Sequence, residues 1–269
     1  MELDWISFTT DYGLDDGFVA ACKGVIARIA PAARVIDISH TVPPQDVRRG
    51  ATVLAQTVPY LPEAVHLAVV DPGVGTARRG LALVAPDGVL VGPDNGLLIP
   101  AAEALGGVRA AYELTDPGYR LPTVSATFHG RDVFAPAAAH LALGLGAAKL
   151  GPALDTTTLH RLPAPVTTCS TGRLQTEVLS VDRFGNLQLA AGAADLAAAG
   201  LHSPAHLTLH TGTTTVDLEL ATTFGDVPEG AVVAFVDSAG LVAVAVNGGA
   251  AARDLHLGPG ACVDLRAVG

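Results

Sequence analysis

Cysteine is scarce in this chain of 269 residues, which contains only Cys22, Cys169 and Cys262. The three lie far apart and show no CxxC spacing, so the sequence indicates neither a disulfide framework nor a thiolate zinc site. We expect them to be core thiols. The His and Asp positions also lack the spacing typical of metal ligands, and we predict neither a metal nor a cofactor.

Long apolar runs are absent as well. Hydrophobic residues make up 49% of the chain, but the longest weakly polar stretch, Ala135–Ala148, is interrupted by His140 and by glycines and prolines. No segment is therefore expected to span a membrane. The opening residues, MELDWISFTT, lack the basic start and apolar run of a signal peptide. These features predict a cytoplasmic protein without a membrane partner.

Basic clusters are few. The formal net charge is −10 and the isoelectric point is about 5.2, and adjacent arginines occur only at Arg48-Arg49 and Arg78-Arg79. A nucleic-acid partner is not expected from such a chain, and a small molecule is the better expectation. No GxGxxG follows an early strand, which argues against a methyltransferase. The sequence also shows no convincing repeat or charge block.

What the sequence does contain, in its first half, is an alternation of strands and helices. Strands are predicted at Trp5–Thr10, Arg34–Ser39 and Val65–Val70, with a helix between residues 16 and 30 and a second one capped by Asp46. Such alternation predicts parallel pairing with right-handed crossovers. The carboxyl ends of all three strands should then meet at one edge of a Rossmann-like α/β domain.

Polar residues follow each of these strands. Asp11, His40 and Asp71 all fall at the predicted edge, which is where open α/β sheets bind ligands. The glycine-rich turn after Asp71 allows Arg78 to return toward the carboxylate, giving an Asp-Arg pair over a pocket. The competing interpretation is a β-turn whose Asp caps its own backbone and whose Arg is solvated. Three polar residues at one edge favour the site.

Two later segments add detail to this domain. The stretch Leu81–Ile99 contains two β-rich runs around Pro86-Asp87-Gly88, which predicts a hairpin. The segment Ala126–Gly146 is expected to begin extended and to become a helix after Pro136. His129 should then lie in the loop ahead of that helix. A lone His of this kind is more often structural than catalytic until a partner is identified.

The character of the chain changes after Pro163-Ala164-Pro165. From Val166 onward it consists mostly of short alternating runs separated by Gly, Asn and Asp turns, with one short helix near Ala193–Ala199. We therefore predict an N-terminal α/β domain over residues 1–163 and a β-rich domain over residues 166–269. Two turns in the second domain, Asp182–Asn186 and Asp237–Gly240, would by themselves be simple tight turns.

Together these segments resemble a known family, the S-adenosylmethionine hydroxide adenosyltransferases. They are also called adenosine-forming S-adenosylmethionine hydrolases and are relatives of fluorinase and chlorinase. The motifs run through nearly the whole chain in the family's order: FTTDYGLDDGFVAACKG (Phe8–Gly24), DISH (Asp37–His40), VDPGVGTARR (Val70–Arg79), GPDNGLL (Gly92–Leu98), TFHGRD (Thr127–Asp132) and DRFGN (Asp182–Asn186). The resemblance implies an α/β domain, a β-barrel-like C-terminal domain, and a homotrimer with active sites at the subunit interfaces.

The resemblance also implies roles for individual residues. The hydrolase triad falls on Asp71, Arg78 and His129, and the carboxylate that binds the ribose diol falls on Asp11. Further substrate-binding positions are Asp16 and Asp182 near the methionine moiety, Phe184 and Asn186 on the adenine side, Ser238 as a methionine contact, and Phe128 and Asn247. Gln45 and Ala239 depart from the fluorinase pattern, so contacts at those two positions are not carried over.

The implied reaction is hydrolysis of S-adenosyl-L-methionine to adenosine and L-methionine. Asp71 and His129 would order a water and accept its proton as it attacks C5′ in line with the leaving sulfur. The first alternative is a halide-dependent, chlorinase-like adenosyltransferase, against which the negative charge of Asp71 argues. The second is a non-catalytic nucleoside-binding protein, because a fold does not guarantee activity.

Overall fold

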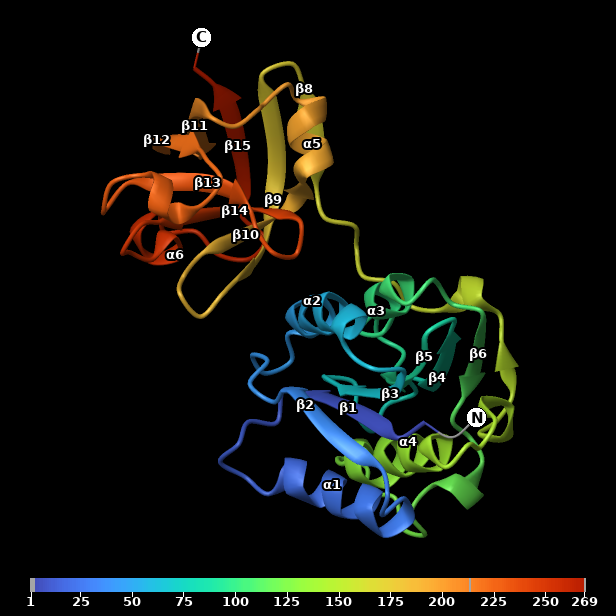
Figure 1. Ribbon diagram of the computed structural model, residues 1–269. Helices are drawn as coiled ribbons and strands as arrows, with labels where there is room; N and C mark the ends of the chain where they lie inside the picture. Colours follow the sequence, from blue (N-terminus) through green and yellow to red (C-terminus); the bar gives the residue numbers. More distant parts are fainter. Residues whose placement is uncertain (1–2, 213, 269) are drawn as a thin grey trace. The chain divides into compact units, whose positions relative to one another are not determined.

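The computed structural model describes residues 3–212 and 214–268 and divides the chain into two compact units, Met1–Leu162 and Pro163–Gly269 (Figure 1). The division falls at the start of the Pro163-Ala164-Pro165 segment. No helix formed by the described residues is long and apolar enough to cross a membrane.

A seven-stranded sheet in the order β2-β1-β3-β5-β4-β6-β7 forms the centre of the first unit. The strands are β1 (Trp5–Thr10), β2 (Arg34–Ser39), β3 (Ala64–Val69), β4 (Gly80–Ala85), β5 (Gly88–Pro93), β6 (Ala110–Glu113) and β7 (Ala153–Leu154). Pairing is parallel over β2-β1-β3-β5 and antiparallel from there to β7. The predicted Rossmann-like arrangement is thus confirmed for the half that contains β1, β2 and β3, while β4 and β5 form the predicted hairpin.

Helices cover both faces of this sheet (Figure 1). They are α1 (Phe18–Ile29), α2 (Val47–Thr57), α3 (Ile99–Ala104) and α4 (Ala135–Ala142). Helices α1 and α4 share a core with Phe8 and Leu67, whereas α2 and α3 share another with Ala68 and Val70. Because successive side chains of a strand point to opposite faces, the apolar run of β3 is buried on both sides. The predicted cap of α2 is present, since Asp46 accepts a hydrogen bond from the Arg49 amide at 2.9 Å.

The sequence prediction for Ala126–Gly146 was wrong at its start. Ala126 and Thr127 form a turn rather than an extended run, and the helical segment begins near His129 instead of after Pro136. A wide π-type turn over Gly130–Phe134 precedes α4, and the Ala135 amide donates to the Gly130 carbonyl. Such a turn lets a helix continue through the region where proline removes a donor and crowds the preceding turn.

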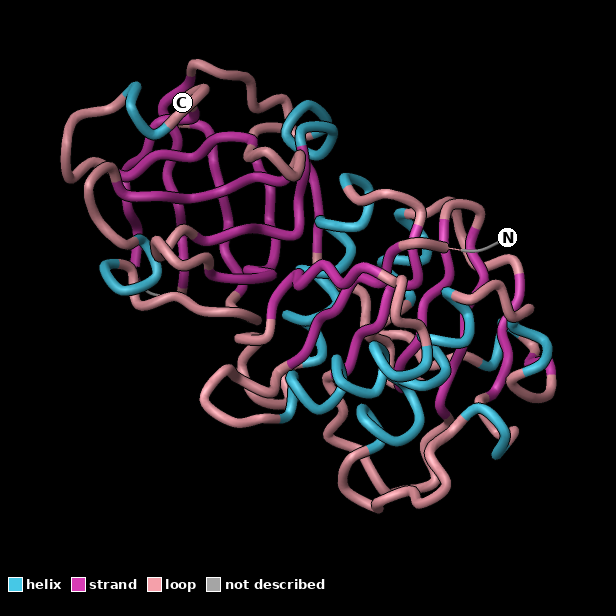
Figure 2. Tube along the Cα trace, turned by 60° about the horizontal axis from the view of Figure 1, so that its bottom comes forward, coloured by secondary structure: helices cyan, strands magenta, loops and turns pink. Residues whose placement is uncertain are grey.

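The second unit is a closed barrel of seven strands. The sheet order β10-β14-β13-β12-β11-β15-β9-β8, with an additional β10–β9 pairing, joins β10 back to β9 and leaves β8 as an extra strand. The strands of both units are drawn in magenta in Figure 2. Its elements are β8 (Thr167–Ser170), β9 (Arg173–Val181), β10 (Leu187–Gly192), α5 (Ala193–Ala198), β11 (Ala205–Thr211), β12 (Thr214–Leu220), β13 (Val232–Val236), β14 (Leu241–Val246), α6 (Ala251–Asp254) and β15 (Cys262–Ala267). This confirms the barrel-like domain that the resemblance implied.

Short helical turns complete the two units. They are the 3₁₀ turns Val58–Tyr60, Pro117–Tyr119, Ala147–Lys149, Thr156–Thr158 and Phe224–Asp226.

The three cysteines do not share one environment. Cys22 is buried in α1, Cys169 is half-buried, and Cys262 is exposed. The expectation that all three are core thiols is therefore wrong for Cys262. It is the first residue of β15, opposite Glu177, at a position where the strand's alternation directs the side chain outward.

A buried histidine in β3 makes the stability of the protein depend on pH. His66 is fully buried, its Nδ1 lies 2.8 Å from Ser7 Oγ, and its Nε2 has no partner among the described residues. Burial lowers the pKa of His66 from 6.5 to about 4. Between these values the unfolded chain binds a proton that the folded chain does not.

We therefore predict that the free energy of unfolding falls as the pH falls from 6.5 toward 4, by up to about 3 kcal/mol from this group. Urea unfolding of the wild type and of His66→Gln at pH 7 and pH 4.5 measures this effect. The variant should lose less stability than the wild type between the two values. Equal losses would show that His66 is not responsible.

Candidate active site

Asp71, Arg78 and His129 meet at the carboxyl end of β3. The Arg78 Nε lies 2.9 Å from Asp71 Oδ1 and 3.0 Å from Oδ2. The Arg78 Nη2 contacts Asp71 Oδ2 as well and lies 2.9 Å from His129 Nδ1. The side chains of Asp71 and Arg78 are only 5% and 12% exposed. The alternative of a solvated Arg78 is therefore wrong, and one guanidinium bridges the other two groups.

The guanidinium is also held by an aromatic ring. Arg78 Cζ lies 5.0 Å from the centroid of Phe134, which is fully buried at the end of the π-type turn. This cation–π contact adds a further restraint on the position of the guanidinium. No local sequence pattern indicates this contact, because Phe134 has the pattern of an ordinary core residue.

The contact with Arg78 determines the form of His129. A guanidinium only donates hydrogen bonds, so Nδ1 of His129 accepts and the proton of the neutral ring is on Nε2. Partial burial, followed by the positive charge of Arg78, lowers the pKa of His129 below its usual 6.5, while the negative charge of Asp71 opposes the shift. The ring is therefore neutral at neutral pH, with an N–H group opposite its arginine contact.

Glycines allow the three surrounding segments to approach closely. Gly75 has φ +77°, and a Cβ there would lie 2.3 Å from the Ala126 carbonyl oxygen. A Cβ on Gly130 would lie 2.0 Å from the hydroxyl oxygen of Tyr12. The turn after β3 and the segment after β1 thus both contact the segment around His129, and neither contact leaves room for a side chain at the glycine.

Aromatic rings surround Tyr12. Its centroid lies 6.0 Å from that of Phe18 and 5.8 Å from that of Phe128, and the two phenylalanines lie 5.3 Å apart. Burial, together with nearby acidic groups, raises the pKa of Tyr12, so its hydroxyl stays protonated at neutral pH. Sequence reasoning missed Tyr12 as a site residue, although it lies inside the first family motif.

Asp132 stabilises the segment that contains His129. This fully buried carboxylate accepts from the Ser125 amide at 2.8 Å and from Arg131 Nε at 2.6 Å. Burial alone would raise the pKa of Asp132, but the hydrogen bonds from Arg131 and Ser125 hold it below its usual value. Arg131 in turn lies 4.8 Å above the Phe128 ring. The sequence motif included Asp132 without indicating this role.

A cavity of about 280 Å³ opens beside these residues. Asp11, Asp71 and His129 line it, together with Gln45 and Thr127. Two of the three polar residues predicted at the sheet edge thus face one cavity. His40 is buried and is not among the described residues that line it.

Asp11 is oriented by a backbone group. Its Oδ2 accepts from the Gln45 amide at 2.8 Å, and Gln45 adopts a left-handed φ of +67°. The departure from the family pattern at Gln45 therefore does not remove this contact, because the side chain is not needed for it. Asp16 is exposed and Phe128 is half-buried, and the described lining of the cavity includes neither.

The remaining predicted residues belong to the second unit. In the β9–β10 turn, Asp182 accepts from the Phe184 and Asn186 amides at 2.8 and 2.9 Å, and Phe184 is 76% exposed. Ser238 is exposed in the β13–β14 turn, where the Ala239 amide donates to Asp237.

Asn247 follows β14, and its side-chain amide donates to the Val227 carbonyl at 2.8 Å. The turn interpretation of Asp182 is confirmed.

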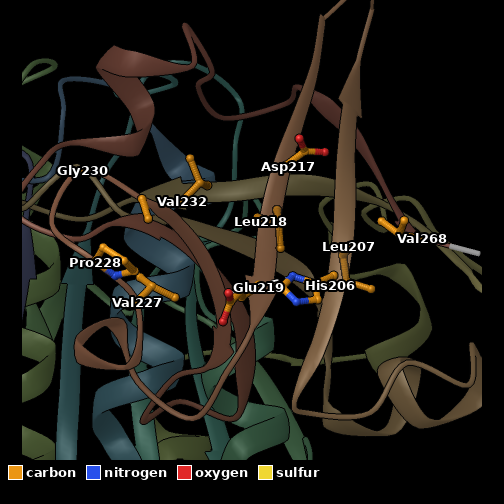
Figure 3. Close-up of a pocket in the computed structure, with 11 residues that line it drawn as sticks. His206, Leu207, Asp217, Leu218, Glu219, Val227, Pro228, Gly230, Val232 and Val268 are labelled. Atoms are coloured by element: carbon orange, nitrogen blue, oxygen red, sulfur yellow. Dashed lines mark ion pairs between the residues drawn. The ribbon is translucent and has the colours of Figure 1, made fainter.

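A larger cavity, of about 580 Å³, lies in the second unit (Figure 3). His206 and Glu219 stand at its wall, with His206 Nδ1 3.9 Å from Glu219 Oε1. None of the residues predicted from sequence is among the described residues that line it. Size alone therefore does not identify the active site, and the convergence of charged groups at β3 is the better guide.

The described residues contain no group of three or more His, Cys, Asp or Glu side chains placed to hold a metal ion.

Comparison with known proteins agrees with these motifs. Residues 6–151 match the SAM hydroxide adenosyltransferase N-terminal domain, and residues 176–264 match the C-terminal domain. The chain is 61% identical to the (R)-S-adenosyl-L-methionine hydrolase of Salinispora arenicola, covering 95% of each chain. It is 31% identical to a fluorinase of Actinoplanes sp., covering 97% of this chain and 96% of the fluorinase.

A solved structure gives the same result for the fold. The crystal structure of an uncharacterized conserved protein from Thermotoga maritima superposes with a TM-score of 0.91 at 34% identity, covering 97% of this chain and 99% of that one. Both domain matches and the full-length relatives lead to one conclusion: the chain belongs to the SAM hydroxide adenosyltransferase family.

Proposed function

We propose that this protein hydrolyses S-adenosyl-L-methionine to adenosine and L-methionine. The observation that carries the proposal is the Arg78 guanidinium, which binds Asp71 and His129 together at the wall of a cavity that also contains Asp11. Support comes from the Salinispora arenicola relative, whose name specifies (R)-S-adenosyl-L-methionine as the substrate it hydrolyses.

The reaction makes modest demands on the protein. Departure of the sulfonium from C5′ releases methionine as a neutral thioether, so the leaving group needs no proton. The protein must hold C5′ in line with a water and remove the water's proton as the C–O bond forms. Asp71, His129 and Asp11, which line one cavity, are sufficient for these tasks.

Asp71 is the group best placed to accept that proton. Its carboxylate retains lone pairs beyond those used by Arg78, whereas Nδ1 of His129 is occupied and Nε2 carries a hydrogen. His129 then donates its Nε2 hydrogen to the oxygen of the water and orients it. Asp71 alone then accepts the proton, which refines the expectation that Asp71 and His129 both do so. Arg78 holds the side chains of Asp71 and His129 in place.

Asp11 binds the ribose in this proposal. The Gln45 amide uses Oδ2, and the remaining acceptor positions of the carboxylate face the two ribose hydroxyls. Charge-assisted hydrogen bonds of this kind orient the sugar and hence C5′. The acidic chain, with a net charge of −10, also suits a cationic substrate.

The cavity lined by Asp11, Asp71 and His129 is smaller than the pockets of about 300–1,000 Å³ that enclose a whole small molecule. We propose that a second chain completes it in a homotrimer. Asp182, Phe184, Asn186, Ser238 and Asn247 would supply adenine and methionine contacts. Asp16 would flank the methionine side, and Phe128 would be a further substrate contact. The 76% exposure of Phe184 is compatible with this assignment, because aromatic residues are enriched where protein surfaces bind partners. We place the activity in the cytoplasm.

Identification of the product tests the function. Incubation with each sulfonium epimer of S-adenosyl-L-methionine, with and without chloride, should give adenosine in amounts that chloride does not change. Chromatography against adenosine and 5′-chloro-5′-deoxyadenosine standards measures this. A chlorinated nucleoside would favour the halide-dependent alternative, and unchanged substrate would favour the non-catalytic nucleoside-binding protein.

Substitution of the residues that act on water should separate turnover from binding. We predict that Asp71→Asn and His129→Ala each lower kcat by about 10²–10⁴-fold, because each removes a group that acts on the proton or position of the water. Adenosine affinity, measured by calorimetry, should change little. Asp87→Asn, in the exposed β4–β5 turn, is the matched control. Near-normal kcat in both variants would refute the assignment.

Subunit mixing tests the shared site. Asp71→Ala and Asn186→Ala proteins should each be inactive, whereas trimers reassembled from both should recover activity. Recovery is expected because some interfaces join the intact first unit of one chain to the intact second unit of the other. Confirmed exchange of subunits without recovery would show that each site lies within one chain.

A further inference from the structure

A chain of hydrogen bonds runs from the residues flanking Asp11 to a buried histidine. Thr10, the last residue of β1, is fully buried, and its Oγ1 lies 2.9 Å from His40 Nδ1. The Tyr12 amide donates to the same Oγ1 at 3.2 Å. The backbone on either side of Asp11 is therefore linked to the imidazole of His40.

The partners of His40 determine the direction of these hydrogen bonds. His40 Nε2 lies 2.9 Å from Asp37 Oδ1, and a carboxylate accepts, so Nε2 carries the proton. In the neutral ring Nδ1 is then an acceptor, and the Thr10 hydroxyl donates to it. This arrangement leaves the lone pairs of Thr10 Oγ1 facing the Tyr12 amide. Lys23 Nζ binds the other carboxylate oxygen of Asp37 at 2.5 Å and completes the chain at the surface.

The backbone of His40 holds the same loop from another side. Its carbonyl accepts from the Gly13 amide at 2.8 Å. Its ring also packs against Phe8 of β1 in a T-shaped contact, with centroids 4.8 Å apart. The segment that follows His40 leads to Gln45, whose amide binds Asp11. His40 thus contacts Thr10 before Asp11 and Gly13 after it, and the segment that follows His40 supplies the Gln45 amide that binds the carboxylate.

We propose that His40 is a positioning residue for Asp11 and so sets the affinity of the site for the ribose diol. The inference rests on the proposed function, in which Asp11 accepts the ribose hydroxyls. His40 itself contacts no substrate. Its imidazole fixes the Thr10 hydroxyl, which fixes the Tyr12 amide, and the Asp11 carboxylate between them keeps one orientation.

An apolar side chain of the same size could fill the volume of His40 but not this role. The fully buried Thr10 hydroxyl would lose its acceptor and would turn toward another group. The Tyr12 amide would then lose its partner in turn. If His40 positions Asp11, its hydrogen bonds are needed. If His40 only fills space, an apolar side chain of the same volume would replace it.

Two conservative variants of His40 test its two ring nitrogens one at a time. Asn places its amide near the position of Nδ1, so His40→Asn keeps a partner for Thr10, whereas His40→Gln reaches toward Asp37 and does not. His66→Gln is the matched control, because His66 is also a buried histidine and binds a β1 hydroxyl, that of Ser7, away from the site. Thr10→Val and Thr10→Ser test the same link from the other side.

The measurement is the ratio of calorimetric affinities for adenosine and 2′,3′-dideoxyadenosine, which lacks the diol. The wild type should prefer adenosine, and His40→Gln and Thr10→Val should lower this preference by about 10-fold, the scale of one hydrogen bond to a charged group. His40→Asn, Thr10→Ser and His66→Gln should stay within about 3-fold of the wild type. The same two impaired variants should raise KM more than they lower kcat.

The outcomes distinguish the inference from the function on which it rests. A wild type that binds both nucleosides equally would remove the ribose role of Asp11, and with it the inference. A wild type that discriminates, with His40→Gln and Thr10→Val discriminating equally well, would overturn the inference alone. If His40→Gln does not fold, Thr10→Val and Thr10→Ser decide the question.

Discussion

The shared guanidinium of Arg78 is the interaction on which the candidate site depends. One planar cation binds the Asp71 carboxylate through two nitrogens, donates to His129 and stacks on Phe134. It therefore fixes the position of the Asp71 carboxylate relative to the His129 imidazole. Because arginine cannot accept a hydrogen bond, it also determines which nitrogen of His129 carries the proton. Lysine would keep the charge but not this geometry.

The fold brings these groups together through the parallel half of the first sheet. Strands β1, β2 and β3 end at the same edge, so Asp11, His40 and Asp71 are neighbours although about 30 residues separate each from the next. His129 arrives from a different part of the chain. The close contacts at Gly75 and Gly130 keep its segment against the other two, so the site is assembled from several short segments that have little freedom to move independently.

The sequence predicted what local patterns control. Strand and helix alternation, the Asp46 cap, the β4–β5 hairpin and the edge position of Asp71 all follow from spacing or turn chemistry, and all are present. The helical segment begins before the predicted position because Pro136 indicates a helix start, whereas no local pattern marks the π-type turn over Gly130–Phe134. The exposure of Cys262 depends on strand register that composition does not reveal. The stacking of Phe134 on Arg78 and the link from Thr10 to His40 join distant residues, so no local pattern indicates them.

The closed barrel of the second unit has a consequence for how it meets other molecules. Strand β9 pairs with β15 along one side, while β8 and β10 divide its other side, so the ladder of backbone hydrogen bonds runs around the barrel. Open sheet edges recruit strands from other chains and are a common origin of aggregation. Closure removes that route for the barrel strands. The second unit must then bind other molecules through its side chains and turns. Substitutions can alter these without disturbing the backbone of the barrel.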